Sequence, residues 1–254
     1  MRLLALFLFI SFSISQALGN CNKEKVILGY DDWRPYQFKE GGKVTGLDVD
    51  LLSAILKSTG CPFKLKAIGW KAHLRELKKG RVHLAPGASM TDDRKKFAFF
   101  SDSYRTESVV MFVKKSNLNT FKPSSLKDLS NIKKFKLGVV RGNFNGDEFE
   151  KLKKEKSFKK IVLEMSGEKQ LYTMLKKDRV QGVLADRYSG FAYLKKLNLG
   201  NTIVLHPLKI YSADIHVMFS KKSVDKKFVD IFNKNLQKLK SDGKYESIIK
   251  QYLE

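Results

Sequence analysis

The sequence predicts an α/β fold with mainly parallel sheets, and two patterns indicate this class. Short apolar runs typical of strands alternate with stretches in which apolar residues recur at helical spacing. Glycines stand where such helical stretches end, as Gly60 and Gly80 do. The chain has 254 residues, 43% of them hydrophobic, so it can bury one large core or two small ones.

The predicted elements form three successive groups. The first group comprises strands at 26–30, 63–68, 82–85 and 108–113, with helices that end at Gly60 and Gly80. The second opens near Pro123 and comprises strands at 137–140, 161–163, 180–185 and 203–205, with helices at about 146–154, 170–177 and 188–197. The third comprises a strand at 215–219, an amphipathic helix over 228–239 and a last helix over 245–252.

The N-terminal segment predicts export. Arg2 precedes an uncharged apolar run over 3–14, and the small residues Ala17 and Gly19 follow it, which is the pattern of a cleaved signal peptide at 1–19. Downstream of it, no apolar run approaches the roughly 18 residues that a membrane span needs. We therefore expect a soluble protein in the periplasm.

The two cysteines, Cys21 and Cys61, are expected to form a disulfide, because a cysteine pair in an exported chain is usually bonded. They precede the strand-like runs at 26–30 and 63–68, and adjacent parallel strands would place both sulfurs at one end. Two unpaired buried thiols remain the alternative. A lipid anchor on Cys21 is less favoured, because Asn20 stands where lipoprotein signals place a small residue.

The net charge is +23, from 49 Lys and Arg against 26 Asp and Glu. Such a charge allows nucleic acid, an anionic membrane or acidic solutes as partners. The sequence shows no nucleic-acid motif and no single basic patch, so solvated lysines are the simpler explanation. We expect neither metal nor cofactor, because the histidines lack metal-ligand spacing: His73, His83, His206 and His216.

A series of short motifs occurs in an order and at spacings that are specific when taken together. It includes Trp33-Arg34-Pro35-Tyr36, Gly46-Leu47-Asp48-Val49-Asp50-Leu51, Ser89-Met90-Thr91-Asp92-Asp93-Arg94, Phe100-Ser101-Asp102-Ser103-Tyr104, Leu137-Gly138-Val139 with Gly142, and Asp178-Arg179-Val180 leading to Asp186. From about Val26 to Leu253 the chain resembles the type II periplasmic solute-binding proteins. It is most similar to their family 3 group, which serves polar amino-acid transporters.

The resemblance implies two Rossmann-like lobes joined by two hinge crossings, near 114–117 and 202–208, with the ligand in the cleft between the lobes. Residues 20–113 and 208–254 would form one lobe, and residues 114–207 the other. The implied function is a monomeric receptor that delivers a small polar solute, with an amino acid favoured, to an ABC-type membrane permease. No catalytic residue is implied.

The resemblance also implies that Arg94 binds the α-carboxylate of the ligand, since a guanidinium can form two parallel hydrogen bonds to a carboxylate. By sequence alone, Arg94 also fits a surface arginine in the charged run 92–96. Further donors to the same ligand group would come from the segment before it: Gly87, Ala88, Ser89 and Thr91.

Asp186 would meet the ligand's α-ammonium group. It follows the predicted strand 180–185 at its carboxyl end, where open α/β sheets place ligands, and it also fits the N-cap of the next helix. Trp33 and Trp70, the two tryptophans, would pack on the ligand's side chain. Trp70 equally fits a core position on its helix.

Some residues depart from the family pattern. After Gly142, where the family commonly has two small hydroxyl residues, the chain has Asn143 and Phe144, so the contact from the second lobe is altered. The solute is therefore left open. Two alternative functions use the same fold: a periplasmic cyclohexadienyl or arogenate dehydratase, and a stand-alone sensory module. We predict no enzyme, because no acid–base pair can be assigned.

Overall fold

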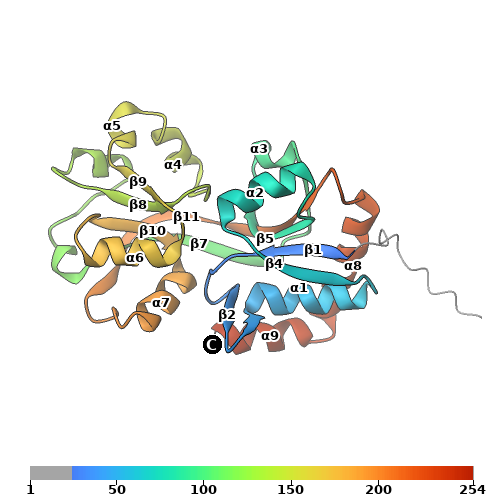
Figure 1. Ribbon diagram of the computed structural model, residues 1–254. Helices are drawn as coiled ribbons and strands as arrows, with labels where there is room; N and C mark the ends of the chain where they lie inside the picture. The colour runs from blue at the N-terminus through green and yellow to red at the C-terminus, as the bar shows by residue number, and fades with distance from the viewer. Residues whose placement is uncertain (1–24, 254) are drawn as a thin grey trace, which may run out of the picture.

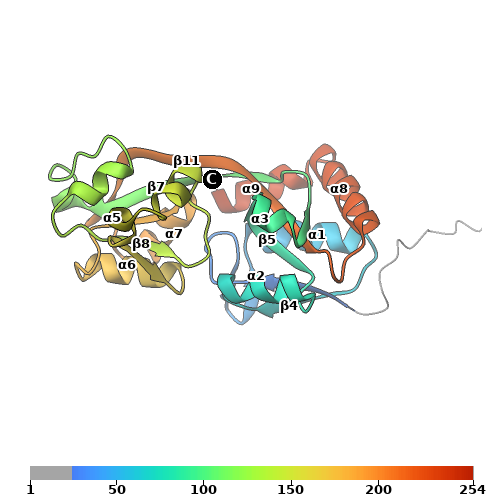
Figure 2. The same ribbon diagram turned by 90° about the horizontal axis from the view of Figure 1, so that it is seen from above.

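The computed structural model describes residues 25–253, which form two lobes joined by two long strands (Figures 1 and 2). The predicted two-lobed α/β class is confirmed. The predicted signal peptide at 1–19 lies outside the described residues. Within the described part, no helix is both long and apolar enough to cross a membrane.

The first lobe combines both ends of the described chain, drawn in blue to green and in red in Figure 1. Its strands are β1 (Val26–Tyr30), β2 (Phe38–Glu40), β3 (Lys43–Thr45), β4 (Phe63–Ala67), β5 (Leu84–Ser89) and β6 (Ala98–Phe100). Its helices are α1 (Leu47–Ser58), α2 (Trp70–Lys79), α3 (Asp92–Lys95), α8 (Lys226–Ser241) and α9 (Lys244–Leu253).

The second lobe is built from the middle of the chain. Its strands are β8 (Leu137–Val140), β9 (Val162–Met165) and β10 (Gly182–Asp186). Its helices are η1 (Lys115–Asn117), η2 (Lys127–Asn131), α4 (Asp147–Leu152), α5 (Lys156–Lys159), α6 (Glu168–Lys176) and α7 (Arg187–Lys196). The strands β7 (Arg105–Lys114) and β11 (Ile203–Ser220) run through both lobes.

One sheet passes through both lobes in the order β4-β1-β5-β11-β7-β10-β8-β9, and β6 pairs with β11 beside this path. The outer pairs are parallel: β1 with β4 and β5, and β8 with β9 and β10. The central pairs are antiparallel, because β7 leaves the first lobe while β11 returns to it. The sheet is therefore mixed rather than mainly parallel.

β11 is longer than the sequence indicates. The apolar runs at 203–205 and 215–219 predict two strands, but the structure has one strand of 18 residues. Most of the segment between these runs is exposed or half-buried, and its sequence shows no regular apolar alternation that would predict a strand. Hydrogen bonds to β7 hold it extended, with register shifts near Lys209.

β7 and β11 change partners along their length. Val109–Val113 of β7 are Cα partners of β10 in the second lobe, whereas 215–219 of β11 pair with β5 in the first lobe. The stretch between these pairings, about 105–108 with 211–214, connects the lobes. The hinge crossings were expected near 114–117 and 202–208. These hinge positions, and the lobe bounds drawn from them, stay predictions.

Each lobe buries an apolar core of its own. In the first lobe, Leu51 and Ile55 of α1 pack with Phe232 of α8 in one cluster. In the second lobe, Phe135 and Phe149 lie in a separate cluster under β8 and β10. Because each lobe is stabilised by its own core, polar residues are left to fill the space between the lobes.

The register of β1 and β4 bears on the expected disulfide. Val26 and Phe63 are Cα partners in this parallel pair, so the two strands begin side by side. Cys61, two residues before Phe63, is only 4% exposed. Since Cys21 lies outside the described residues, its bond to Cys61 stays a prediction.

Candidate ligand-binding site

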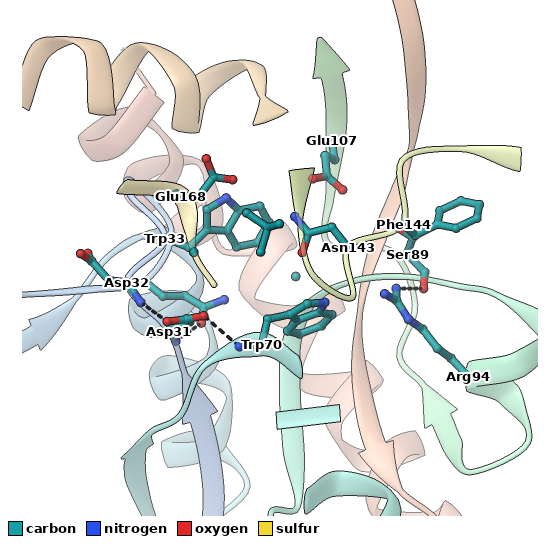
Figure 3. A pocket seen from close by; sticks show the side chains of 14 residues that line it. Asp31, Asp32, Trp33, Trp70, Ser89, Arg94, Glu107, Asn143, Phe144 and Glu168 are labelled. Atoms are coloured by element: carbon teal, nitrogen blue, oxygen red, sulfur yellow. Dashed lines mark hydrogen bonds between the residues drawn. The ribbon is translucent and has the colours of Figure 1, made fainter. Parts of the chain in front are cut away.

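A cavity between the two lobes brings together residues from six separate segments (Figure 3). It is lined by Asp31, Asp32, Trp33, Gln37, Trp70, Gly87, Ser89, Arg94, Glu107, Val140, Asn143, Phe144, Gly167 and Glu168. The space between these side chains, counted to its opening, is about 550 Å³.

Trp33 lies in the loop after β1, and a backbone bridge to Gln37 holds this loop. Its ring packs at 4.7 Å from that of Tyr36. Gly87 in β5 has φ 74°, and a Cβ there would lie 2.4 Å from Cζ3 of Trp33. A glycine is therefore required at residue 87 for Trp33 to stand at the cavity wall.

Trp70 and Arg94 both donate hydrogen bonds from the first lobe to one carbonyl of the second. The Nε1 atom of Trp70 lies 3.0 Å from the Gly142 oxygen, and Nη2 of Arg94 lies 3.2 Å from it. The Nη1 atom of Arg94 donates to the Ser89 carbonyl at 2.8 Å. These contacts join the lobes beside the cavity and fix the plane of the guanidinium.

Arg94 is a buried cation, with 8% of its surface exposed. Burial lowers its pKa to about 10, and the nearby acidic side chains of Glu107 and Glu150 oppose this shift. Arg94 therefore stays protonated at neutral pH. Its guanidinium lies 5.4 Å from the Trp70 ring, so the arginine is held between a ring and two carbonyls and borders the cavity.

Two buried carboxylates, which the sequence analysis did not single out, border the same cavity. Glu107 projects from β7 and Glu168 begins α6, and they are 8% and 5% exposed. Burial first, then the charge of Asp186, raises the pKa of Glu107 to about 8. Burial also holds the pKa of Glu168 well above its usual range, with Asp186 and Glu107 adding to the effect.

The sequence carried little signal for these two glutamates. Glu107 stands in an alternating strand, where a charged residue normally faces solvent. Glu168 is the first residue of a helix, where an acidic side chain already suits the helix dipole. Both line a cavity whose other residues come from segments far apart in sequence.

Asp186 lies at the end of β10, 2% exposed, and its carboxylate is engaged by three donors. Oδ1 accepts from the Tyr36 hydroxyl at 2.7 Å and from the Ser189 amide at 3.0 Å. Oδ2 accepts from the Ser108 amide at 3.3 Å. Asp186 is thus the N-cap of α7, and it does not line the cavity.

Seven of the ten residues predicted for the site lie around this cavity: Trp33, Trp70, Gly87, Ser89, Arg94, Asn143 and Phe144. Ala88, Thr91 and Asp186 do not line it. Ala88 is fully buried in an apolar cluster, and the Thr91 hydroxyl accepts from the Arg94 amide at 3.3 Å as the cap of α3. The ligand contacts assigned to the ten residues stay predictions.

A buried ion pair supports the wall that carries Trp33. The Nε atom of Arg105 lies 3.0 Å from Oδ1 of Asp48, and both side chains are almost fully buried. Gln37 donates to the same carboxylate at 3.1 Å. The Arg105 guanidinium lies 3.8 Å from the Tyr36 ring and 4.9 Å from the Trp33 ring.

Among residues 25–253, no group of three or more His, Cys, Asp or Glu is placed to hold a metal ion.

Two lobes that close around a cavity with one arginine and several carboxylates define a solute-binding protein. The chain belongs to the bacterial extracellular solute-binding proteins, family 3, whose model matches residues 26–254. The arginine-binding extracellular protein ArtP of Bacillus subtilis (strain 168) is 27% identical, over 97% of this chain and 96% of that protein.

Solved structures agree with this assignment. The arginine-, lysine-, histidine-binding protein ArtJ of Geobacillus stearothermophilus has a TM-score of 0.76 and 26% identity, over 91% of this chain and 95% of that one. An ancestral amino-acid-binding protein described as a precursor of cyclohexadienyl dehydratase has a TM-score of 0.75 and 25% identity, over 91% and 96%. All three of these proteins are named as binding proteins rather than enzymes.

Proposed function

We propose that this extracellular solute-binding protein binds an amino acid between its lobes and delivers it to an ABC-type permease. The observation that carries the proposal is that a basic side chain and acidic side chains border different parts of the cavity. Arg94 lies on one side, and Glu107 and Glu168 lie on another (Figure 3). An amino acid carries a carboxylate and an ammonium group, so it complements both sides at once.

The carboxylate would bind Arg94. Two carbonyls already orient its guanidinium, and a guanidinium has five N–H donors, so donors remain for a ligand. Arg94 is buried, which strengthens a charge-assisted hydrogen bond. Ser89, on the same wall, offers a neutral partner for the same group.

The ammonium would meet the carboxylates that border the cavity. Asp186, the partner expected from the family resemblance, would first have to exchange its bond from Tyr36 for one from the ligand. Glu107 and Glu168 already lie at the wall and need no such exchange. We therefore assign the ammonium to these two glutamates and a role in closing the lobes to Asp186.

Trp33 and Trp70 would enclose the rest of the ligand, since both rings line the cavity from the first lobe. Phe144 and Asn143 line it from the second lobe, so a ligand that touches all four favours the closed arrangement. Two relatives described above are named for binding amino acids, which supports the same ligand class. We place the receptor in the periplasm as a monomer.

A thermal-shift screen of amino acids, organic acids and polyamines tests the proposal, because a ligand that binds only the folded state raises the melting temperature. We expect stabilisation by at least one L-amino acid and not by its N-acetylated form. The Arg94→Ala variant should lose this stabilisation. Absence of stabilisation by any amino acid, or turnover of prephenate or arogenate, would contradict the proposal.

A further inference from the structure

We propose that the solute is an amino acid with a positively charged side chain, and that Glu107 and Glu168 select it. This inference rests on the proposed function and narrows its ligand class. It depends on three observations: the charge of the cavity walls, the carboxylates that remain without a cation, and one buried oxygen without a partner.

The cavity is acidic although the protein is strongly basic. The whole chain has 49 basic and 26 acidic residues, yet the walls carry Asp31, Asp32, Glu107 and Glu168 against the single base Arg94 among the described residues. The surplus of lysine elsewhere therefore does not extend into the cavity. An acidic lining favours a ligand cation, which stabilises the ionised form of these carboxyl groups, and it opposes an acidic ligand.

Two of the four acids are already engaged by the protein. Asp31 accepts from the Trp70 amide at 2.9 Å and from the Asp32 amide at 2.8 Å. Asp32 is about half exposed and lies 3.9 Å from Arg34. In contrast, no basic side chain within the described range lies within 4.0 Å of Glu107 or Glu168.

Glu168 gives the most direct sign of a missing partner. Its Oε2 atom is buried and makes no hydrogen bond within the described structure. A buried polar atom without a partner is costly and calls for an explanation, and for a side chain at the cavity wall a ligand group supplies one. This oxygen belongs to a side chain that lines the cavity, where a ligand would reach it (Figure 3).

The number of cations on the ligand favours a cationic amino acid over a neutral one. A ligand with one carboxylate, one ammonium and a neutral side chain places its anion on Arg94 and offers a single cation to Glu107 and Glu168, so one of the two stays protonated. A ligand with one further cation gives each glutamate a partner, so both can ionise in the buried site.

Binding of such a ligand should also release protons. Burial keeps the pKa of Glu107 at about 8 and that of Glu168 well above its usual range, so both bind protons near neutral pH. The charged groups acting on Glu107 are Asp186, Arg105, Arg94 and Asp48, and none of them supplies a cation in contact. A ligand cation lowers both pKa values and displaces the protons.

Calorimetry with matched ligands on the full mature chain tests the inference. L-Arginine and L-citrulline have nearly the same shape, but only arginine has a charged side chain. Agmatine keeps the guanidinium and lacks the carboxylate. We expect arginine or lysine to bind at least about 30-fold more tightly than citrulline or glutamine, and to release protons into the buffer.

Variants assign the effect to the two glutamates. Glu168→Gln and Glu107→Gln keep the side-chain shape. The variant at the glutamate that meets the side-chain cation should lower arginine affinity by about 30-fold while changing glutamine affinity little, and the variant at the glutamate that meets the α-ammonium should weaken binding of both ligands. Glu148→Gln, on the exposed face of α4, is the matched control and should leave both unchanged. Because the variants are compared by their arginine-to-glutamine ratio, partial loss of folded protein does not mimic the result.

The outcomes separate this inference from the proposed function. If citrulline and arginine bind with equal affinity, the proposed selection of a cationic side chain is wrong, and the proposal of an amino-acid receptor still stands. If agmatine binds as tightly as arginine, the α-carboxylate is not recognised and the proposal of an amino-acid receptor is wrong. The proposal that the carboxylates bind a cation still stands in that case. Unchanged arginine-to-glutamine ratios in both glutamate variants would overturn the assignment of residues.

Discussion

The Tyr36 hydroxyl and the Asp186 carboxylate form a buried hydrogen bond of 2.7 Å that joins the two lobes. Tyr36 belongs to the loop after β1, and Asp186 ends β10, 150 residues later. Tyr193 makes a second contact between the lobes, from its hydroxyl to the Asp32 carbonyl at 2.7 Å. Hydrogen bonds within the chain thus stabilise the closed arrangement on both sides of Trp33.

Removing the Tyr36 hydroxyl should shift the lobes toward a more open arrangement. A hydrogen bond to a charged group contributes about 1.5–3 kcal/mol, so Tyr36→Phe should lower the closed population markedly. Small-angle scattering without ligand should show a larger radius of gyration for this variant. Tyr30→Phe, in β1, is the control, and an unchanged radius for Tyr36→Phe would contradict the role of this bond.

Arg94→Lys should weaken amino-acid binding although it preserves the charge. Lysine cannot form two parallel hydrogen bonds to a carboxylate, and it cannot also contact the carbonyls of Ser89 and Gly142. Arg94→Ala should cost about 2–5 kcal/mol of binding free energy. Calorimetry measures both losses, and Arg179→Ala on the exposed surface serves as control. Unchanged affinity in the two Arg94 variants would refute the contact between Arg94 and the ligand carboxylate.

The stability of the protein without ligand should fall as pH rises from about 5 to 8. The pKa of Glu107 is about 8 in the folded protein and 4.5 in its ordinary range. Between these values the folded state holds a proton that the unfolded state has lost, so stability decreases with pH. Glu168 acts in the same direction, because its pKa is also raised.

Glu107→Gln should make this pH dependence shallower, because glutamine does not titrate. Urea unfolding at pH 5.5 and at pH 8 measures the difference in unfolding free energy for each protein. The difference should be smaller in the variant than in the wild type. An equal difference in both would show that Glu107 is not protonated in the folded state.

Loss of one partner of the buried ion pair should destabilise the first lobe. Arg105→Met leaves the carboxylate of Asp48 buried without its cation, which costs about 3–5 kcal/mol. Urea unfolding measures the loss, and a second substitution, Asp48→Leu, should recover part of it. Lys226→Ala breaks the exposed pair with Asp230 and should cost less than about 1 kcal/mol.

Much of the fold could be predicted from local patterns. The helical spacing of Leu47, Leu51 and Ile55 corresponds to α1, and the αL glycine at Gly80 ends α2 as expected. The middle of β11 could not be predicted, because pairing with β7 rather than its own apolar pattern holds it extended. The antiparallel centre of the sheet likewise follows from two strands that connect the lobes in opposite directions.

The lining of the cavity was predicted in part, on both of its sides. Trp33 and Arg94 line the cavity, and each belongs to a motif that is contiguous in sequence. Glu107 and Glu168 could not be found in the same way, because each has an ordinary explanation within its own strand or helix.

A crystal structure of the protein with L-arginine would test the central claim most directly. We predict that the α-carboxylate lies within hydrogen-bonding distance of the Arg94 guanidinium. The side-chain cation should lie against Glu168 or Glu107, with Tyr36 still bonded to Asp186. An arginine bound with its carboxylate away from Arg94, or outside the cavity between the lobes, would contradict the account.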